Sequence, residues 1–119
     1  METSILTSTK KILQIPASYT AFDQDIITHI NAAFSILNQL GLGQPDGFMI
    51  EDASAEWEEF DVPMNQLNLV KTYIHLKVRI LFDPPAMSFA LEAAKEQVRE
   101  YEFRLNVNRE NALPEEVEL

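Results

Sequence analysis

Apolar residues between Asn65 and Pro85 recur at the spacing of a helix and cover much more than one face of it. At about 100° per residue they form two adjacent rows, Leu67, Val70, Ile74, Val78 and Leu81 in one and Leu69, Tyr73, Leu76 and Ile80 in the other. Together the rows span roughly 200° of the helix surface. The pattern predicts a long central helix that packs on two sides, against other helices of its own chain or against a neighbouring subunit.

The polar side of this helix is narrow and basic. It consists of Asn68, Lys71, Thr72, His75 and Arg79, while Lys77 lies inside the apolar arc. By contrast, the segment from Asp46 to Asp61 holds seven carboxylates and no Lys or Arg. Such a contrast is typical either of solvated surface or of complementary faces in an oligomer. In the second case, the candidate subunit interface joins Lys71, His75 and Arg79 of one subunit to Glu51, Glu56, Glu58 and Glu59 of the next.

Two shorter helices are predicted before the central one. The first begins at Thr7 or Ser8, whose hydroxyl can accept a hydrogen bond from the first turn. The second begins at a capping box formed by Thr20 and Asp23, and Gly41 ends it. Apolar residues at a spacing of three and four give the second helix the single core-facing side of an ordinary surface helix.

The last predicted helix covers residues 88–106, with Ser88 or Asp83 as its cap, and follows Asp83-Pro84-Pro85. Because two successive prolines cannot continue a helix, this tripeptide is a candidate structural hinge. The apolar residues of the helix alternate by three and four like a coiled-coil seam, at Leu91, Ala94, Val98, Tyr101 and Leu105. Phe89 and Phe103 lie off this seam, either as exposed surface or as contacts in an oligomer.

Two segments lack a long helical pattern. Residues 41–65 are too many for an ordinary connection, and such loops tend to be functional or disordered. Trp57 and Phe60 predict a short helix that fastens this loop to the core, and we interpret Trp57 as a core residue in preference to a partner anchor. Residues 107–119 form an acidic tail, so the chain divides into a helical domain at 1–106 and a tail at 107–119 that a partner would order.

Composition narrows the class of protein. The 119 residues suit one small all-α domain of about four helices, with a long central helix and a charged C-terminal one. The sequence has no cysteine, no signal-peptide pattern and no apolar run that could span a membrane, so we expect a cytosolic site of assembly. The net charge of −10 disfavours binding to nucleic acid through phosphate contacts.

No pattern in the sequence indicates catalysis or a cofactor. It contains no glycine-rich phosphate loop and no nucleophile elbow. His29 and His75 are more simply explained as packed or surface residues than as metal ligands. The carboxylates of the loop lack the ligand order of a calcium site, so solvated charge is preferred for Glu51, Asp52, Glu56, Glu58 and Glu59. We therefore predict a protein that is not an enzyme and that has no catalytic residue, metal or cofactor.

The order of these parts resembles one family. The segments STKKIL, YTAFDQDIITHINAAFSILNQLGLG, GFMIEDASAEWEEF, VKTYIHLKVRILFDPP and EFRLNV together are similar to the small head-tail connector proteins of long-tailed bacteriophages and prophages. The resemblance covers about residues 7–107. Its most specific part is the VKTY…VRILFDPP block followed by the charged helix.

The resemblance implies a structural adaptor in the virion neck. Such a subunit forms a homo-oligomeric ring, dodecamer-like, beneath the portal protein, extends the DNA channel and joins the capsid to a downstream stopper or tail-completion protein. Genome DNA passes through the lumen without specific binding, which the acidic composition suits. No membrane is involved. The candidate contacts to the portal or neck are Phe103, Arg104, Arg109, Leu113 and Val117.

Two other classes of function are compatible with the same residues. An acidic DNA mimic or a regulatory protein-binding module would use the negative charge, but it would act as a monomer or dimer. A hydrolase with a carboxylate metal site is the weaker alternative. The state of assembly and the metal content of the purified protein separate these classes from a ring-forming connector.

Overall fold

The computed structural model describes the backbone of residues 3–117 and the side chains of residues 3–107. Within that range the chain forms α-helices α1 (Ile5–Ile12), α2 (Asp23–Gln39), α3 (Met64–Phe82) and α4 (Ser88–Val117), and the short 3-10 helix η1 (Trp57–Glu59). The described residues contain no strand, only an isolated bridge between Ser4 and Glu56. The prediction of an all-α fold with four helices is confirmed.

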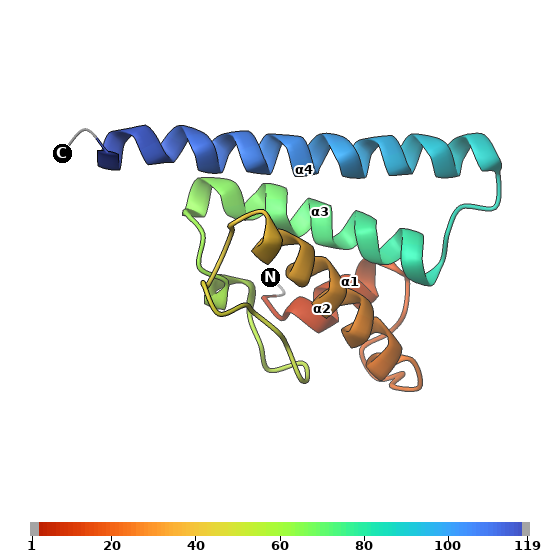
Figure 1. The fold of residues 1–119 in the computed structure, drawn as a ribbon. Coiled ribbons are helices and arrows are strands. Elements are labelled where there is room, and N and C mark those ends of the chain that lie inside the picture. The colour runs from red at the N-terminus through yellow and green to blue at the C-terminus, as the bar shows by residue number, and fades with distance from the viewer. Residues whose placement is uncertain (1–2, 118–119) are drawn as a thin grey trace.

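Helix α3 lies at the centre of the molecule. Figure 1 shows α4 running along one side of it, while α2 and α1 lie on another side. The predicted packing on two sides is therefore confirmed, and the chain supplies both covering layers itself. Five α3 residues are buried, Leu67, Val70, Tyr73, Ile74 and Val78. Leu81 continues the same row but is 43% exposed, because it lies in the last turn, where the chain leaves the core.

The beginnings of α1 and α2 differ from the predictions. The Ser4 hydroxyl accepts a hydrogen bond from the N–H of Thr7 at 3.2 Å, so Ser4 is the cap of α1 and the prediction of Thr7 or Ser8 is wrong. Helix α2 begins at Asp23 without any side-chain cap, and the predicted capping box is wrong as well. The physical reason is that the Asp23 carboxylate lies 2.7 Å from the ammonium group of Lys10.

Lys10 fastens the connection between α1 and α2. Its side chain is buried, and its Nζ donates to the carbonyl oxygens of Ala17 at 3.2 Å and Tyr19 at 2.8 Å. Together with the Asp23 carboxylate, these acceptors satisfy the three donors of the ammonium group, which makes burial of its charge tolerable. The loop is thereby tied to the start of α2.

The end of α2 agrees with the sequence. Gly41 adopts a φ of 89°, which favours glycine, and its N–H donates to the Asn38 carbonyl at 2.9 Å. The N–H of Leu42 donates to the Leu37 carbonyl at 2.9 Å. This pair of bonds is a Schellman motif, and both leucines are buried, as such a motif favours.

Helix α4 follows the proline-containing turn. The predicted break is confirmed, because α3 ends at Phe82 and Asp83 has non-helical angles of −146° and 71°. Ser88 is the first residue of α4. The predicted seam faces α3, with Val98 and Leu105 buried and Leu91, Ala94 and Tyr101 half-buried.

Helix α4 also continues further than predicted. The expected end at Asn106 is wrong, since the helix runs to Val117. No glycine or proline interrupts residues 86–113, so nothing in that stretch breaks the helix. The division of the chain at residue 106 into a domain and a tail stays a prediction. Among the described residues, no helix is both long and apolar enough to cross a membrane.

Candidate functional site

The loop between α2 and α3 is fixed to the body of the protein. Trp57 is only 2% exposed, and its indole N–H donates to the Ser8 hydroxyl at 2.9 Å. The backbone pairs with the start of the chain, since the N–H of Trp57 donates to the Thr3 carbonyl and the N–H of Ile5 to the Ala55 carbonyl. The interpretation of Trp57 as a core residue is confirmed.

Two asparagines of α2 hold the first half of the same loop. Asn31 exchanges two hydrogen bonds with the backbone of Ile50, accepting from its N–H at 2.8 Å and donating to its carbonyl at 3.0 Å. Asn38 donates to the Gln44 carbonyl at 3.1 Å. These bonds replace the regular backbone pairing that the segment lacks. The backbone of the loop is irregular, but hydrogen bonds to side chains of α2 hold it in place.

The basic side of α3 is partly covered by this loop. The His75 ring lies 5.4 Å from the Trp57 ring, and the Lys71 ammonium group lies 5.9 Å from the centroid of the same Trp57 ring. Burial, together with the smaller effect of the charge of Lys71, lowers the pKa of His75 to about 4. His75 is therefore neutral at pH 7. The helical wheel places Lys71 and Arg79 away from the core of the chain, but Trp57 packs against Lys71 as well as His75.

Arg79, in contrast, remains exposed, with its Nε donating to the Asp83 carbonyl at 3.3 Å. The predicted acidic partners are also at the surface, namely Glu51, Glu56, Glu58 and Glu59. Within the side chains that the structure describes, none of these four carboxylates forms an ion pair. Glu59 accepts from the N–H of Glu56 at 2.8 Å, which caps η1. The contact between subunits predicted for these residues stays a prediction.

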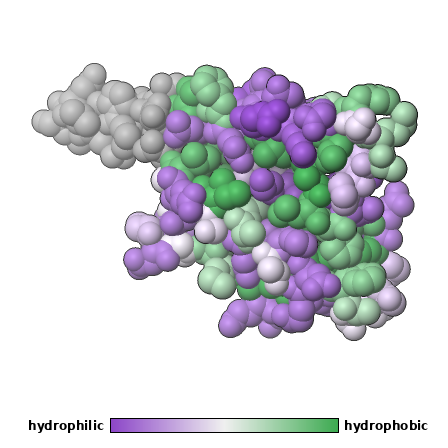
Figure 2. Space-filling model, turned by 45° about the vertical axis from the view of Figure 1, so that its right-hand side comes forward, coloured by the Kyte–Doolittle hydropathy of each residue, from purple (hydrophilic) through white to green (hydrophobic). Residues whose placement is uncertain are grey.

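Helices α3 and α4 border a groove on each side of their contact. One groove, of about 320 Å³, is lined by Ile12, Thr72, His75, Leu76, Arg79, Gln97 and Tyr101. The other, of about 340 Å³, is lined by Lys77, Ile80, Leu81, Lys95, Val98, Arg99 and Glu102. Figure 2 shows apolar side chains reaching the surface between hydrophilic ones along the terminal helix and beneath it. The second groove was missed by reasoning from sequence, although Lys77 inside the apolar arc was a signal for it.

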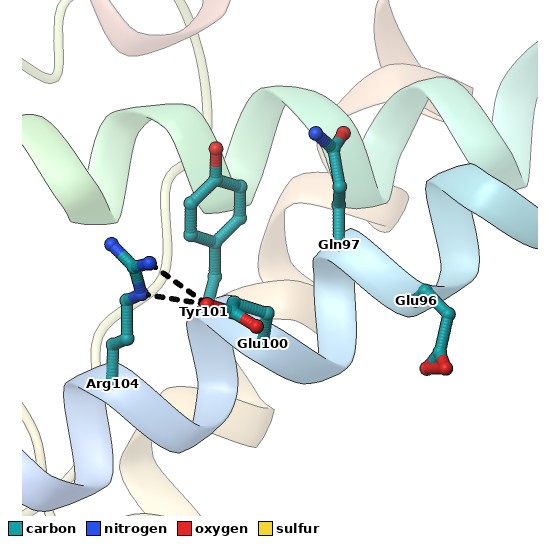
Figure 3. A pocket seen from close by; sticks show the side chains of 5 residues that line it. All are labelled: Glu96, Gln97, Glu100, Tyr101 and Arg104. Atoms are coloured by element: carbon teal, nitrogen blue, oxygen red, sulfur yellow. Dashed lines mark hydrogen bonds and ion pairs between the residues drawn. The ribbon is translucent and has the colours of Figure 1, made fainter.

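The end of α4 carries part of the candidate portal contact. Phe103 is 68% exposed, and Phe89, near the start of the helix, is 69% exposed. Arg104 makes a two-pronged pair with Glu100 at 2.8 and 3.0 Å, the i, i+4 arrangement that favours a helix (Figure 3). In Figure 3, Tyr101 and Gln97 point toward α3 while Glu96 points away. The side chains of Arg109, Leu113 and Val117 lie outside the described residues.

The family of the chain follows from its sequence match. The family model described as phage connector protein matches residues 5–112, which is most of the chain. The chain belongs to this family. The resemblance read from the sequence is thereby confirmed. No curated protein and no solved structure matches the connector.

Phage connectors are structural proteins. His29 and His75 lie in separate aromatic settings, with the His29 ring 6.4 Å from Phe82 and the His75 ring beside Trp57. Among the described side chains, no three metal-ligating groups come close enough to share an ion. The surface features that could contact a partner are two grooves, an acidic loop and exposed aromatic residues on α4.

Proposed function

We propose that this connector assembles as a ring, dodecamer-like, beneath the portal and joins the filled capsid to a stopper or tail-completion protein in the virion neck. The observation that carries the proposal is the family match together with the exposed apolar residues of α4. Phe89 and Phe103 are each about two-thirds exposed on a small protein. Aromatic residues are enriched at protein–protein interfaces, so these two exposed rings are candidates for contacts in an assembly.

The charge of the connector supports a role in which subunits enclose DNA without binding to it. A net charge of −10 and exposed carboxylates repel phosphates, so DNA would move through a lumen of such subunits without adhering. The ring would assemble in the host cytoplasm before or during attachment to the head. A negatively charged channel needs no specific residue, so no DNA-binding side chain is proposed.

The mass of the assembled connector tests directly whether it forms a ring. Mass photometry of the purified connector over a range of concentrations, and images of isolated necks, are expected to show a closed ring of many subunits. A connector that is monomeric or dimeric in assembled particles would contradict the proposal. That result would favour a regulatory binding module instead.

We further propose that residues 103–119 contact the portal. Phe103 offers an exposed ring, Arg104 and Arg109 can pair with carboxylates, and Leu113 and Val117 add apolar anchors. Truncation after Asn106 keeps the buried Leu105, so the shortened protein is expected to remain helical. It should no longer attach stably to DNA-filled capsids that carry a portal. Normal yields of infectious particles from the truncated protein would rule this contact out.

A matched pair of substitutions makes the same test at one side chain. Phe103→Ala and Phe89→Ala remove rings of almost equal exposure from opposite ends of the described part of α4. We expect only Phe103→Ala to weaken attachment to the portal. Equal losses from both would mean that a general apolar surface, not the end of α4, makes the contact.

The turn Asp83-Pro84-Pro85 is proposed to fix the angle between α3 and α4. Both prolines restrict the backbone at the point where the chain reverses. Replacing both by alanine is expected to leave helix content nearly unchanged, as measured by circular dichroism, while assembly is impaired. A double variant that enters rings as well as the wild type would remove the hinge role.

A further inference from the structure

The groove formed by Lys77, Leu81, Lys95, Val98 and Arg99 combines an apolar floor with a basic rim. Val98 is buried at its floor, and Leu81 is 43% exposed, although most residues of its row on α3 are buried. The groove also contains a carboxylate, that of Glu102. This carboxylate accepts a hydrogen bond from the buried Tyr73 hydroxyl at 2.8 Å, so it is engaged within the chain.

The cations at this groove have weak partners or none. Within the described side chains, Lys77 makes no ion pair. Lys95 lies 3.7 Å from Glu92 and Arg99 lies 2.9 Å from Glu96, in exposed pairs along one helix. Exposed pairs of this kind contribute little to stability, so a partner can displace them. Three of the nine Lys and Arg residues in an acidic chain therefore gather at one groove.

The loop after α2 presents a complementary feature. Met49 is 72% exposed, although the residues on either side of it are held in place. Phe48 packs against Phe34 with ring centroids 4.9 Å apart, and Ile50 is paired with Asn31. An unbranched thioether side chain thus projects from a fixed backbone, which suits it to fill an irregular apolar groove.

Carboxylates flank this methionine along the chain. Asp46, Glu51 and Asp52 are exposed and lie within three residues of it. Among the described side chains, these three form no ion pair. The loop is therefore an apolar tip within a negatively charged segment. The groove is an apolar floor beside three cations, with the carboxylate of Glu102 also in its lining.

We propose that the Met49 loop of one copy docks in the groove between α3 and α4 of a second copy. Met49 would lie on Leu81, Ile80 and Val98, and the carboxylates of its loop would face the cations at the rim. This inference rests on the proposed ring and names the two surfaces that join its subunits. It replaces Lys71 and His75, which lie against Trp57, by Lys77, Lys95 and Arg99. Lys77 is half-buried, as Lys71 is, whereas Lys95 and Arg99 are exposed.

A second copy is the occupant that the geometry favours. A head-to-tail ring requires every subunit to carry two different, mutually complementary surfaces. The loop follows α2, the groove lies between α3 and α4, and no loop residue lines that groove. Copies with a net charge of −10 repel one another, so their contact must use a local concentration of cations.

Disulfide trapping tests the contact at one pair of positions. The chain has no cysteine, so the double variant Met49→Cys, Leu81→Cys contains the only two thiols. Under mild oxidation of the assembled protein, we expect a ladder of covalent multimers up to the closed ring. The control, Met49→Cys with Ile12→Cys, places the second thiol at a residue of similar exposure, 48%, in the opposite groove. It should not give this ladder.

Charge reversal tests the same contact without a covalent bond. Glu51→Lys with Asp52→Lys, or Lys77→Glu with Lys95→Glu, should each lower the association constant at low salt by about tenfold or more. The variant that carries all four changes should recover most of the loss. Reversal of Lys71 and Arg79 to glutamate is the control and should have a much smaller effect. Circular dichroism confirms that each variant is folded.

The outcomes separate this inference from the proposed function. If the wild type forms rings but the two cysteine pairs behave alike, or if reversing Lys71 and Arg79 disrupts assembly while reversing the groove does not, the inference is wrong and the ring stands. If the wild type forms no closed ring, either purified or in isolated necks, the proposed function fails and the inference fails with it.

Discussion

Helix α3 places its basic residues in two different settings. Near its middle, Lys71 and His75 lie against Trp57, and burial keeps the histidine neutral. Less than two turns further on, Lys77 borders an open groove beside the exposed Leu81. The residues in the first setting contribute to the stability of the fold, while those in the second border a groove that the described part of the chain leaves open. The comparison shows that residues of one charge type on one helix take their roles from whichever element covers them.

The covered setting depends on the tryptophan. Trp57→Ala is expected to destabilise the protein by about 3–5 kcal/mol, because it leaves a cavity beside α3 and removes the partner of the Ser8 hydroxyl. Chemical denaturation followed by circular dichroism measures the loss. Trp57→Phe keeps a ring but not the indole N–H, so it should cost only about 1–2 kcal/mol. Equal losses from both would mean that the hydrogen bond, rather than the ring, secures this side of α3.

The loop that carries Trp57 needs a glycine at its start. Gly43 has a φ of 79°, and a Cβ at this position would overlap the Phe60 ring. Gly43→Ala should therefore destabilise the protein by about 2–3 kcal/mol, through backbone strain and displacement of Phe60. Gly47→Ala is the control, because its φ of 96° is also unfavourable but a Cβ there meets no atom. A similar loss in both variants would show that strain alone accounts for the effect.

The neutral histidine makes the covered setting sensitive to acid. Its pKa is about 4 in the folded protein and about 6.5 when unfolded, so below pH 6.5 the unfolded chain takes up the proton first. The titration of His75 should therefore leave stability unaffected above that pH and should lower it by up to about 3 kcal/mol as the pH drops through 4. His75→Gln removes this titration, so its stability should fall less steeply with pH than that of the wild type. Parallel curves for the two proteins would contradict the lowered pKa.

The smallest effect compares the two lysines directly. Lys71→Glu loses a contact with the Trp57 ring and is expected to cost about 1 kcal/mol of folding free energy. Lys77→Glu changes a side chain at an open groove and should cost less than about 0.5 kcal/mol in the monomer. Denaturation at low protein concentration measures both. A larger loss from Lys77→Glu would mean that its groove already contributes to the fold.

The main helices were predictable because their patterns are long. Nine apolar positions on α3 and a five-residue seam on α4 leave little choice of packing, and Gly41 ends α2 at the expected place. The break after Phe82 was also predictable, because two successive prolines remove two backbone N–H donors and disfavour the helical conformation of the residue before each of them. These features depend on local spacing or on the backbone chemistry of one residue.

The details that decide the candidate site depend on contacts between distant segments. The pairing of Lys10 with Asp23 displaced a capping box that was locally plausible. Trp57 covered part of a helix side that the wheel alone presents as free. Local spacing cannot show which of several similar polar residues another segment will cover, so the open groove at Lys77 became visible only in the folded chain.

Because α4 is long, a small rotation at its start produces a large displacement at its far end. Its 30 residues correspond to about 45 Å of helix, so a rotation of about 10° at the turn before it would displace the far end by about 8 Å. The packing of Val98 and Leu105 therefore determines the direction of the C-terminal end of α4 as well as the stability of the domain. In the proposed ring, a substitution that shifts this seam slightly would move the end of every α4 in the same direction and so change the diameter of the circle that these ends form.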